Sequence, residues 1–346
     1  MSTTNLIATV DALPGLDPSA PPLAVENLQV EFRTDIGVAK VVNGVTFSVS
    51  AGETLAILGE SGCGKSVTAQ AIMGILDTPP GFVTGGEIRY RGVDLLKLSE
   101  QQRRVVRANK IAMIFQDALS ALNPVFTVGF QLGELFRKHR GMSRADARKR
   151  SIELLDMVKI PAAKDRVSDF PHQFSGGMRQ RVMIAMALAL DPEVLIADEP
   201  TTALDVTVQA QVMQLLAELQ AERNMGLILI THDMGVVADV ADRISVMYAG
   251  RVVEEAPVYD IYANPAHPYT KALLESIPRV DLKGQQLRAI GGLPPALTNL
   301  PPGCSFAPRC RYAQDVCRQS PAPQLHTVSP SRGARCHFWQ EVIGDE

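Results

Sequence analysis

The chain is 346 residues long and 46% of them are hydrophobic, which is enough to bury a sizeable core in one large domain or two ordinary ones. Its formal net charge of −3 is spread without long runs of one sign, and this argues against a nucleic-acid groove or a patch for anionic lipids. The longest apolar runs fall far below the roughly 18 residues that span a bilayer, so we expect no segment that crosses a membrane alone.

The first fifty residues predict a tail followed by a hairpin. Residues 1–22 are rich in Ala, Ser, Thr and Pro and lack the basic start and long apolar stretch of a secretory signal, so we expect a disordered N-terminal tail. Apolar and polar residues then alternate from Leu23 to Phe32 and from Val41 to Val49, on either side of the turn-prone segment Thr34 to Gly37. This pattern is typical of two antiparallel strands.

A phosphate-binding unit follows the hairpin. The apolar segment Thr54 to Leu58 runs into a glycine-rich turn and then into a helix from about Lys65. In this context the turn matches the Walker A pattern, with the residues Gly59, Glu60, Ser61, Gly62, Cys63, Gly64, Lys65 and Ser66, followed by Val67. Glycines let backbone N–H groups curl around phosphates, Lys65 reaches the outer phosphates, and the Ser66 hydroxyl binds Mg²⁺. Cys63 fills a variable position, for which we expect no redox role.

Four more buried strands are expected, and one of them ends in two carboxylates. The strands are Ile111 to Phe115, Val194 to Ala197, Leu227 to Ile230 and Ile244 to Tyr248. Asp198 can order Mg²⁺ and its waters, and Glu199 is the candidate general base that orients water for attack on the γ-phosphate. An acidic pair alone is more often a solvated strand end, but the Walker A turn upstream favours the catalytic interpretation.

Helical patterns dominate the middle of the chain. Strand signals vanish between Asp117 and Pro171, and segments such as Ala145 to Val158 have helical spacing, so we expect an inserted helical subdomain. A long helical segment then opens with Ser175, Gly176 and Gly177, which at a helix N-terminus can hold an anion. Further polar residues follow the predicted strands or the carboxylates Asp198 and Glu199, namely Gln116, Asp205 and His232.

In order and spacing these motifs resemble the ABC ATPases, and residues 115–124, 199–211 and 267–274 are similar to the peptide and nickel importer branch of that family. The resemblance implies an α/β fold: an ABC-type P-loop nucleotide-binding domain with a RecA-like core, an antiparallel β subdomain and a helical subdomain. A small irregular Cys-rich region follows. The implied divisions are a disordered tail (1–22), the nucleotide-binding domain (23–257, with the helical subdomain at about 117–175) and an oligopeptide/dipeptide-transporter-type C-terminal region (258–346).

The resemblance also assigns roles to single residues. Gln116 binds Mg²⁺ or the attacking water, His232 contacts the γ-phosphate, and Phe32 stacks on the base, although a strand phenylalanine packs in a core by default. A lone histidine at a strand end is likewise more often structural. Ser175, Gly176 and Gly177 act on the ATP of a partner subunit, and Asp205 communicates across the interface between the two.

The function implied is an ATP-binding and ATP-hydrolysing subunit that powers an ABC importer for di- and oligopeptides. Its partners are then a second ABC ATPase subunit, two transmembrane permease subunits and, through them, a substrate-binding protein, at the cytoplasmic face of the plasma membrane. Nickel or another small solute is an alternative cargo. A non-transport ABC ATPase acting on DNA or ribosomes is disfavoured by the single compact cassette without a basic stripe. An iron–sulfur sensor with a vestigial nucleotide site is disfavoured by the intact Glu199 and His232.

Four of the five cysteines lie close together near the C-terminus: Cys304, Cys310, Cys317 and Cys336. Their separations are unlike the tight pairs of zinc ribbons, and all-thiolate ligation suits iron–sulfur chemistry. Some members of the peptide importer branch carry a [4Fe–4S] cluster in this region, so the resemblance favours such a cluster here. Zinc and bare thiols remain as alternatives.

Overall fold

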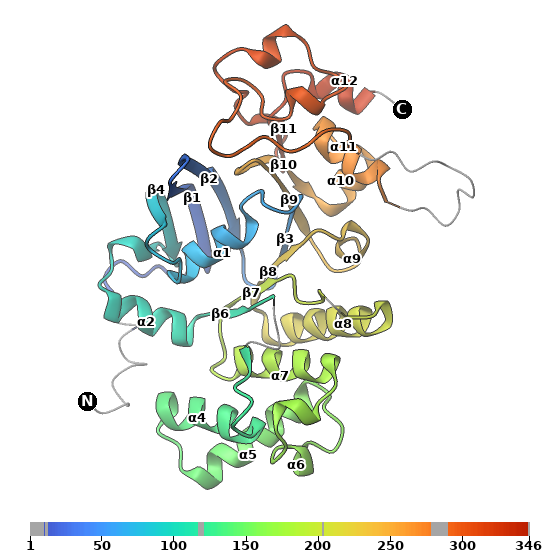
Figure 1. The fold of residues 1–346 in the computed structure, drawn as a ribbon. Helices are drawn as coiled ribbons and strands as arrows, with labels where there is room; N and C mark the ends of the chain where they lie inside the picture. The colour runs from blue at the N-terminus through green and yellow to red at the C-terminus, as the bar shows by residue number, and fades with distance from the viewer. Residues whose placement is uncertain (1–9, 11–12, 117–120, 203, 278–289, 345–346) are drawn as a thin grey trace. The chain divides into compact units, whose positions relative to one another are not determined.

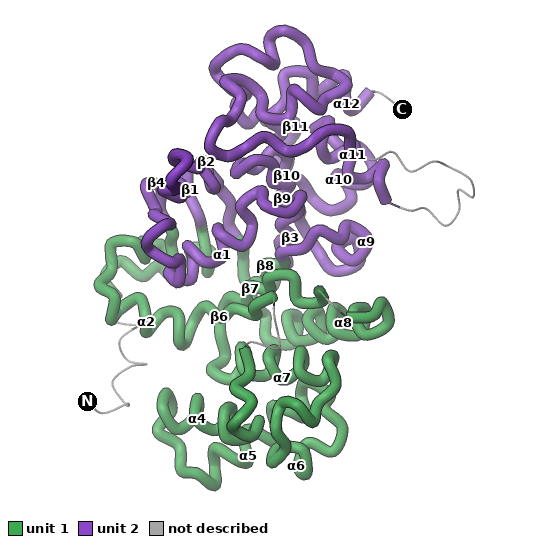
Figure 2. The backbone as a smooth tube through the Cα atoms, in the orientation of Figure 1, with its two compact units in different colours: residues 1–24, 49–53, 88–229 green, residues 25–48, 54–87, 230–346 purple. Residues whose placement is uncertain are grey.

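The computed structural model describes residue 10 and residues 13–116, 121–202, 204–277 and 290–344. Within these residues no helix is both long and apolar enough to cross a membrane. The chain divides into two compact units, shown in green and purple in Figure 2. Unit 1 comprises residues 1–24, 49–53 and 88–229, and unit 2 comprises residues 25–48, 54–87 and 230–346.

Unit 2 contains most of the strands (Figure 1). They are β1 (Leu23–Thr34), β2 (Gly37–Val49), β3 (Thr54–Leu58), β4 (Gly81–Tyr90), β9 (Arg243–Tyr248), β10 (Arg251–Pro257), β11 (His326–Ser329) and β12 (Arg332–Ala334). The helices are α1 (Lys65–Met73), α9 (Met234–Val237), α10 (Val258–Ala263), α11 (Pro268–Glu275) and α12 (Trp339–Gly344), with 3-10 turns at Ala307–Arg309 and Asp315–Arg318. The first residues of β1, the last residue of β2 and the last residues of β4 belong to unit 1. The predicted hairpin strands and the predicted helix start at Lys65 are confirmed.

The sheet around β3 extends into the C-terminal region of unit 2. Strand β3 pairs with β9 in parallel, β9 pairs with β10 antiparallel, and β10 pairs with β12, which in turn pairs with β11. The sequence predicts a division at residue 258, and the region after it contributes β12, which covers the edge of β10 with Ala334 opposite Glu254. An open strand edge leaves backbone N–H and C=O groups unpaired, and β12 satisfies them.

Unit 1 is mainly helical. It contains β5 (Val93–Asp94), α2 (Glu100–Asn109), β6 (Ile111–Ile114), α4 (Val128–Arg140), α5 (Arg144–Met157), α6 (Ala163–Arg166), α7 (Gly176–Leu188), β7 (Val194–Asp198), α8 (Val206–Arg223) and the larger part of β8 (Gly226–Thr231), with 3-10 turns at Leu95–Lys97 and Pro171–Gln173. Strands β6 and β7 pair in parallel. Strand β6 ends at Ile114, one residue earlier than the sequence predicts, and Phe115 is 45% exposed.

Polar caps fix where the helices of unit 1 begin. Thr127, Ser143, Ser175 and Asp205 each accept a backbone N–H of the helix that follows, namely α4, α5, α7 and α8. Such caps satisfy amide groups that a helix start leaves without an intrahelical partner. Helix α5 packs against α4 and α7. The sequence places the helical subdomain in this part of the chain, although residues 117–120 of it lie outside the described residues.

The end of the predicted N-terminal tail is held by hydrogen bonds to other residues of unit 1. Residues 1–9, 11 and 12 lie outside the described residues, but the Asp17 N–H donates to the Arg91 carbonyl at 2.9 Å. The Arg91 guanidinium in turn donates to the carbonyls of Pro18 and Ala20. Arg91 also binds Glu193, the residue directly before β7, with Nε to Oε2 at 2.7 Å. The stretch before β1 is therefore ordered by hydrogen bonds, for which the composition gave no signal.

Candidate nucleotide-binding site

The glycine-rich turn between β3 and α1 has a backbone that only glycines can form without strain. The φ angles of Gly59, Gly62 and Gly64 are 154°, 80° and 103°, which side chains disfavour. A Cβ atom would lie 2.3 Å from the Met247 carbonyl oxygen at Gly59 and 2.4 Å from that of Val41 at Gly64. Gly64 caps α1 without a side-chain acceptor, so the positive N-terminal end of the helix faces the turn, as a phosphate requires.

Lys65 is folded back onto this loop. Its side chain is buried, and Nζ donates to the Gly59 carbonyl at 2.7 Å and to the Glu60 carbonyl at 3.0 Å. The two carbonyls hold the ammonium group at the turn where phosphates would lie. Burial raises the pKa of the neighbouring Cys63 thiol, which disfavours the reactive thiolate form.

Two of the predicted catalytic residues meet in unit 1. Strand β7 is fully buried and ends at Asp198, which is 4% exposed. Glu199 follows with a left-handed φ of 45°, and its Oε2 accepts from Gln116 Nε2 at 2.8 Å and from Thr202 Oγ1 at 2.9 Å. The two donors orient the carboxylate, and the strained backbone turns it away from the strand direction. Thr202 was not among the residues that the sequence analysis selected.

The residues expected to act on the ATP of a partner subunit, Ser175, Gly176 and Gly177, lie at the start of α7. Ser175 caps the helix by accepting the Met178 N–H, and Gly176 and Gly177 are its first two residues. A Cβ at Gly177 would lie 2.5 Å from Cγ1 of Val208 in α8, so a glycine is needed for the close approach of the two helix starts. Asp205 caps α8 and accepts the Val208 N–H at 2.9 Å, which gives Asp205 a structural role beside the predicted one.

The remaining predicted residues belong to unit 2. His232 follows β8 and is exposed. Phe32, the candidate for base stacking, is half-buried in β1, and its ring lies against Gly81, where a Cβ would be 2.9 Å from Phe32 Cε1. Ser66 and Val67 lie in the first turn of α1 and are half-buried.

Two residues that contact the glycine-rich turn, Tyr269 and Arg309, were not predicted as site residues from the sequence. The Tyr269 hydroxyl accepts the Glu60 N–H at 2.8 Å, and the Arg309 guanidinium binds both oxygens of the Glu60 carboxylate at 2.7 and 2.9 Å. Tyr269 lies in a stretch, 267–274, that the sequence analysis used only as a mark of resemblance. Arg309 had no signal, because its partner lies 249 positions away.

His267 positions Tyr269 by capping α11. Its Nδ1 accepts the Tyr269 N–H at 3.0 Å, so the imidazole is neutral in the folded protein. Complete burial lowers the pKa of His267 from 6.5 to about 3. Glu254, which accepts the backbone N–H of His267 at 2.9 Å, has a pKa raised from 4.5 to about 7 by burial.

These two residues predict opposite dependences of stability on pH. The folded state binds fewer protons at His267 than the unfolded state, so its contribution is complete above pH 6.5 and is lost as the pH falls toward 3, at about 1.4 kcal/mol per unit. The contribution of Glu254 to stability depends on pH in the opposite way, because it is lost as the pH rises from 4.5 to 7. We therefore expect the variant His267→Asn, which keeps a capping acceptor, to gain stability relative to the wild type as the pH falls below 6.5. Denaturant unfolding of both proteins at pH 4.5 to 8 measures this, and parallel stability curves would contradict it.

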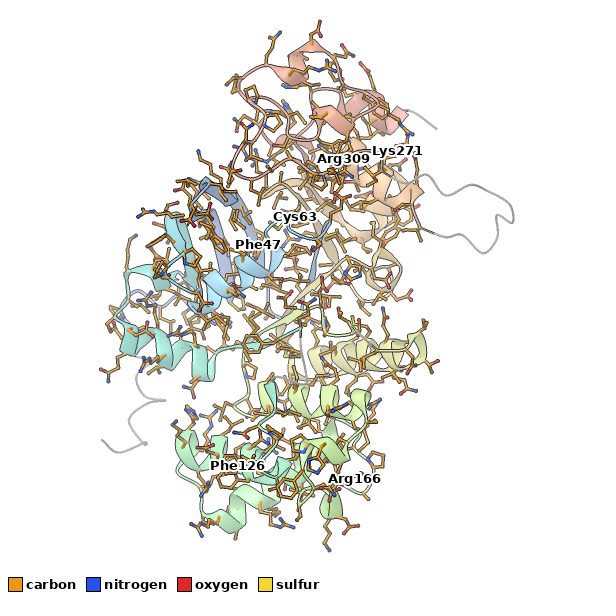
Figure 3. All side chains as sticks on the ribbon, in the orientation of Figure 1. Phe47, Cys63, Phe126, Arg166, Lys271 and Arg309 are labelled. Atoms are coloured by element: carbon orange, nitrogen blue, oxygen red, sulfur yellow. The ribbon has the colours of Figure 1, made fainter. Side chains whose placement is uncertain are left out.

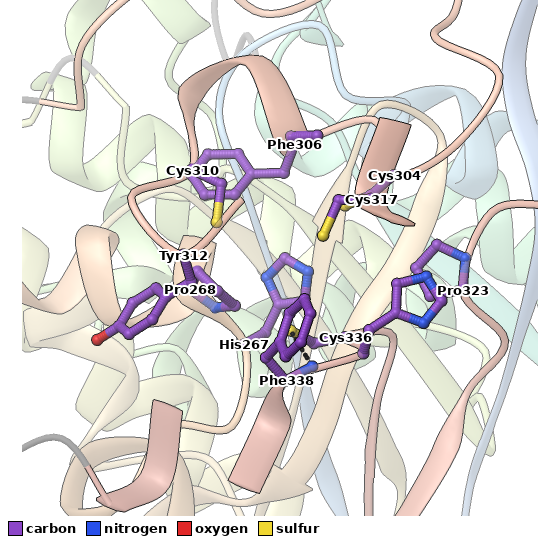
Figure 4. A pocket seen from close by; sticks show the side chains of 12 residues that line it. His267, Pro268, Cys304, Phe306, Cys310, Tyr312, Cys317, Pro323, Cys336 and Phe338 are labelled. Atoms are coloured by element: carbon purple, nitrogen blue, oxygen red, sulfur yellow. Dashed lines mark hydrogen bonds between the residues drawn. The ribbon is translucent and has the colours of Figure 1, made fainter. Parts of the chain in front are cut away.

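The four C-terminal cysteines line one partly open cavity in unit 2 (Figure 4). The cavity has an empty volume of about 310 Å³, which includes space open to solvent, and its wall also contains His267, Phe306 and Phe338. The Phe338 N–H donates to Cys336 Sγ at 3.4 Å. Burial, and then the neighbouring thiols, raise the pKa of Cys310 to about 11 and that of Cys336 to about 12. Among the described residues, no group of three or more His, Cys, Asp or Glu side chains is arranged to hold a metal ion.

Comparison with known proteins gives the same assignment for the two parts of the chain. The family model described as ABC transporter matches residues 42–202, and that described as oligopeptide/dipeptide transporter, C-terminal region, matches residues 253–317. A dimeric ATP-binding cassette solved in a post-hydrolysis state with ADP and Pi is similar to 68% of this chain and 98% of its own, with a TM-score of 0.61 and 30% identity.

Two curated relatives match over nearly the whole chain. The dipeptide transport ATP-binding protein DppD of Bacillus subtilis is 54% identical over 85% of this chain and 88% of its own length. The oligopeptide transport ATP-binding protein OppD of Salmonella typhimurium is 50% identical over 91% of this chain and 92% of its own. The fold and the motifs thus define an ABC-type ATPase with an α/β cassette, as the sequence predicts. The chain belongs to the ABC transporter family, in the branch of ATP-binding proteins with the oligopeptide/dipeptide transporter C-terminal region.

Proposed function

We propose that this ATPase powers the import of di- and oligopeptides. The observation that carries the proposal is the extent of the similarity: relatives named for dipeptide and oligopeptide transport match through the C-terminal region as well as the cassette. The solved cassette, by contrast, covers 68% of the chain. Nickel or another small solute is the alternative cargo, and a non-transport ABC ATPase is a more distant one.

The proposed partners follow from the division of labour in such a transporter. The chain pairs with a second ABC ATPase subunit, identical or homologous, and docks on two permease subunits at the cytoplasmic face of the plasma membrane. A substrate-binding protein delivers the peptide to the permeases. The solved cassette with ADP and Pi is itself a dimer, which supports the pairing. In this arrangement Ser175, Gly176 and Gly177 act on the ATP of the neighbouring subunit.

The predicted site residues then have defined tasks at the nucleotide. Lys65 and the N–H groups of the turn bind the phosphates, Ser66 and Asp198 hold Mg²⁺ or its waters, and Phe32 stacks on the base. Glu199 orients the attacking water with help from Gln116, which also faces Mg²⁺, and His232 contacts the γ-phosphate. The hydrogen bond between Gln116 and Glu199 supports this assignment, since phosphoryl transfer depends chiefly on positioning and charge stabilisation.

Reconstitution of the complete transporter tests the cargo. The chain is purified in complex with its permease subunits and a second ABC ATPase subunit, placed in lipid vesicles, and supplied with ATP on the side of the ATPase subunits. We expect ATP-dependent uptake of labelled di- and tripeptides in the presence of the binding protein. Uptake of nickel without peptide uptake would select the alternative cargo, and ATP hydrolysis that needs no permease would select a non-transport role.

We further propose that Cys304, Cys310, Cys317 and Cys336 bind a [4Fe–4S] cluster. All four thiols line the same cavity, and a backbone N–H points at Cys336 Sγ, which is a common way to stabilise a cluster thiolate. A cluster of four irons takes one cysteine at each iron, so its ligands are spread more widely than those of a single ion. When bound, the cluster would staple a segment with little core of its own. Zinc or bare thiols are the alternatives.

Anaerobic purification tests the cluster. We expect a brown protein with about four iron and four acid-labile sulfide per chain, and loss of both in the variant Cys336→Ser. The matched control is Cys63→Ser, which removes the one cysteine outside the cavity and should keep the iron. Colourless, iron-free wild type would discard the cluster, and one zinc per chain in its place would favour the zinc alternative.

A further inference from the structure

Glu60, the second residue of the glycine-rich turn, is held through all three of its polar groups. Its N–H donates to the Tyr269 hydroxyl at 2.8 Å, and its carbonyl accepts from Lys65 Nζ at 3.0 Å. Its carboxylate binds Arg309, with Oε2 to Nη1 at 2.7 Å and Oε1 to Nη2 at 2.9 Å. Two of these three partners come from the part of unit 2 that follows the cassette.

The Arg309 side chain is fixed on every side. It is 4% exposed, against 26% for Glu60, and its remaining N–H groups donate to the Gly291 carbonyl at 3.0 Å and the Tyr248 hydroxyl at 3.2 Å. The guanidinium also lies over the rings of Tyr248 and Phe306. Figure 3 labels Arg309 together with Cys63 of the turn, both in unit 2. A planar, two-pronged contact of this kind is specific to arginine.

The segment that carries Arg309 is the cysteine-lined one. Arg309 ends the 3-10 turn Ala307–Arg309, directly before Cys310, and the Cys304 N–H donates to the Cys317 carbonyl at 2.8 Å to close the segment. The guanidinium can reach Glu60 only when this segment is folded. The C-terminal region is thereby tied to the phosphate-binding turn by an ion pair whose guanidinium is buried.

We propose that Arg309 is a positioning residue for ATP binding, which holds Glu60 and with it the first half of the turn in the conformation that receives the phosphates. The proposal rests on the assignment of this turn to ATP. When Lys65 moves to the phosphates it releases the Glu60 carbonyl, and the contacts from Tyr269 and Arg309 then keep residue 60 in place. Because the same turn conformation serves the ground state and the transition state, its loss weakens binding more than turnover.

The test uses the variant Arg309→Gln in the assembled transporter, with steady-state ATPase kinetics. We expect the KM for ATP to rise about tenfold with kcat changed less than about twofold. Arg309→Lys keeps the charge without the fork and should give an intermediate KM. Glu60→Gln should reproduce the effect of Arg309→Gln, and the double variant should add little to either, because the two residues act through each other.

The matched control is Arg311→Gln. Arg311 lies two residues further on and makes a similar two-pronged contact with Glu275, at 2.8 and 3.1 Å, away from the turn. We expect it to leave the KM for ATP unchanged. If Arg309→Gln and Arg309→Lys lower the melting temperature but leave KM at the wild-type value, as a purely structural ion pair predicts, the proposal is overturned. The wild-type protein is measured in the same assay. Its ATP hydrolysis and transport test the proposed function independently of the role of Arg309.

Discussion

Replacing Glu199 by Gln leaves ATP bound and lowers the turnover of the assembled transporter by about 10²- to 10⁴-fold, the range typical of a lost general base. The glutamine keeps the size of the side chain and an oxygen that can accept from Gln116 and Thr202, which now bind Oε2 at 2.8 and 2.9 Å. It lacks the negative charge that orients and polarises water. ATP hydrolysis by the complex and ATP binding by calorimetry give the two quantities.

A control at the other end of the same strand separates catalysis from stability. Glu193 precedes β7 and binds Lys110 at 2.9 Å, Arg91 at 2.7 Å and the Tyr90 hydroxyl at 2.9 Å. Glu193→Gln should lower the stability of unit 1 while turnover stays near the wild-type value. Wild-type ATPase activity in Glu199→Gln would contradict the assignment of Glu199 as the general base, whatever the result for Glu193→Gln.

Local sequence patterns were enough to predict the glycine-rich turn and the helix starts. The turn from Gly59 to Ser66 was predicted correctly, because glycine at positive φ, a short apolar strand and a helix start at Lys65 are all encoded within about fifteen residues. The start of α7 at Ser175 was predicted from an equally local pattern. The order of these motifs also predicted the fold class of the cassette, and the comparisons confirm that class.

Contacts between distant residues could not be predicted in this way. Tyr269 and Arg309 reach Glu60 across 209 and 249 positions, and no periodicity within either segment points to the turn. Strands β11 and β12 were missed because four and three residues are too few to establish an alternating pattern. They form because β10 offers an unpaired edge, which is a property of the folded sheet.

Replacing Lys65 by Ala lowers the affinity for Mg·ATP by about 10²-fold, as expected for the loss of a charge-assisted contact to phosphate. Lys65 is the buried cation of the turn, and its Nζ already lies 2.7 Å from the Gly59 carbonyl. In the wild type, ATP at about 100 times its Kd should raise the free energy of unfolding by about 2.7 kcal/mol. We expect most of this gain to vanish in Lys65→Ala, measured as the shift of the melting temperature on addition of Mg·ATP.

Lys271→Ala is the control. Lys271 lies in the same unit as Lys65, but its ammonium group donates to the Val342 carbonyl and not to a carbonyl of the glycine-rich turn. It should keep the full ATP-dependent shift, and an undiminished shift in Lys65→Ala would remove Lys65 from the phosphate site. The same measurement joins this prediction to the role of Arg309. Both residues hold Glu60. Arg309→Gln alone should therefore reduce the ATP-dependent shift of the melting temperature. Adding Arg309→Gln to Lys65→Ala should change that shift little, because the two residues act on one turn.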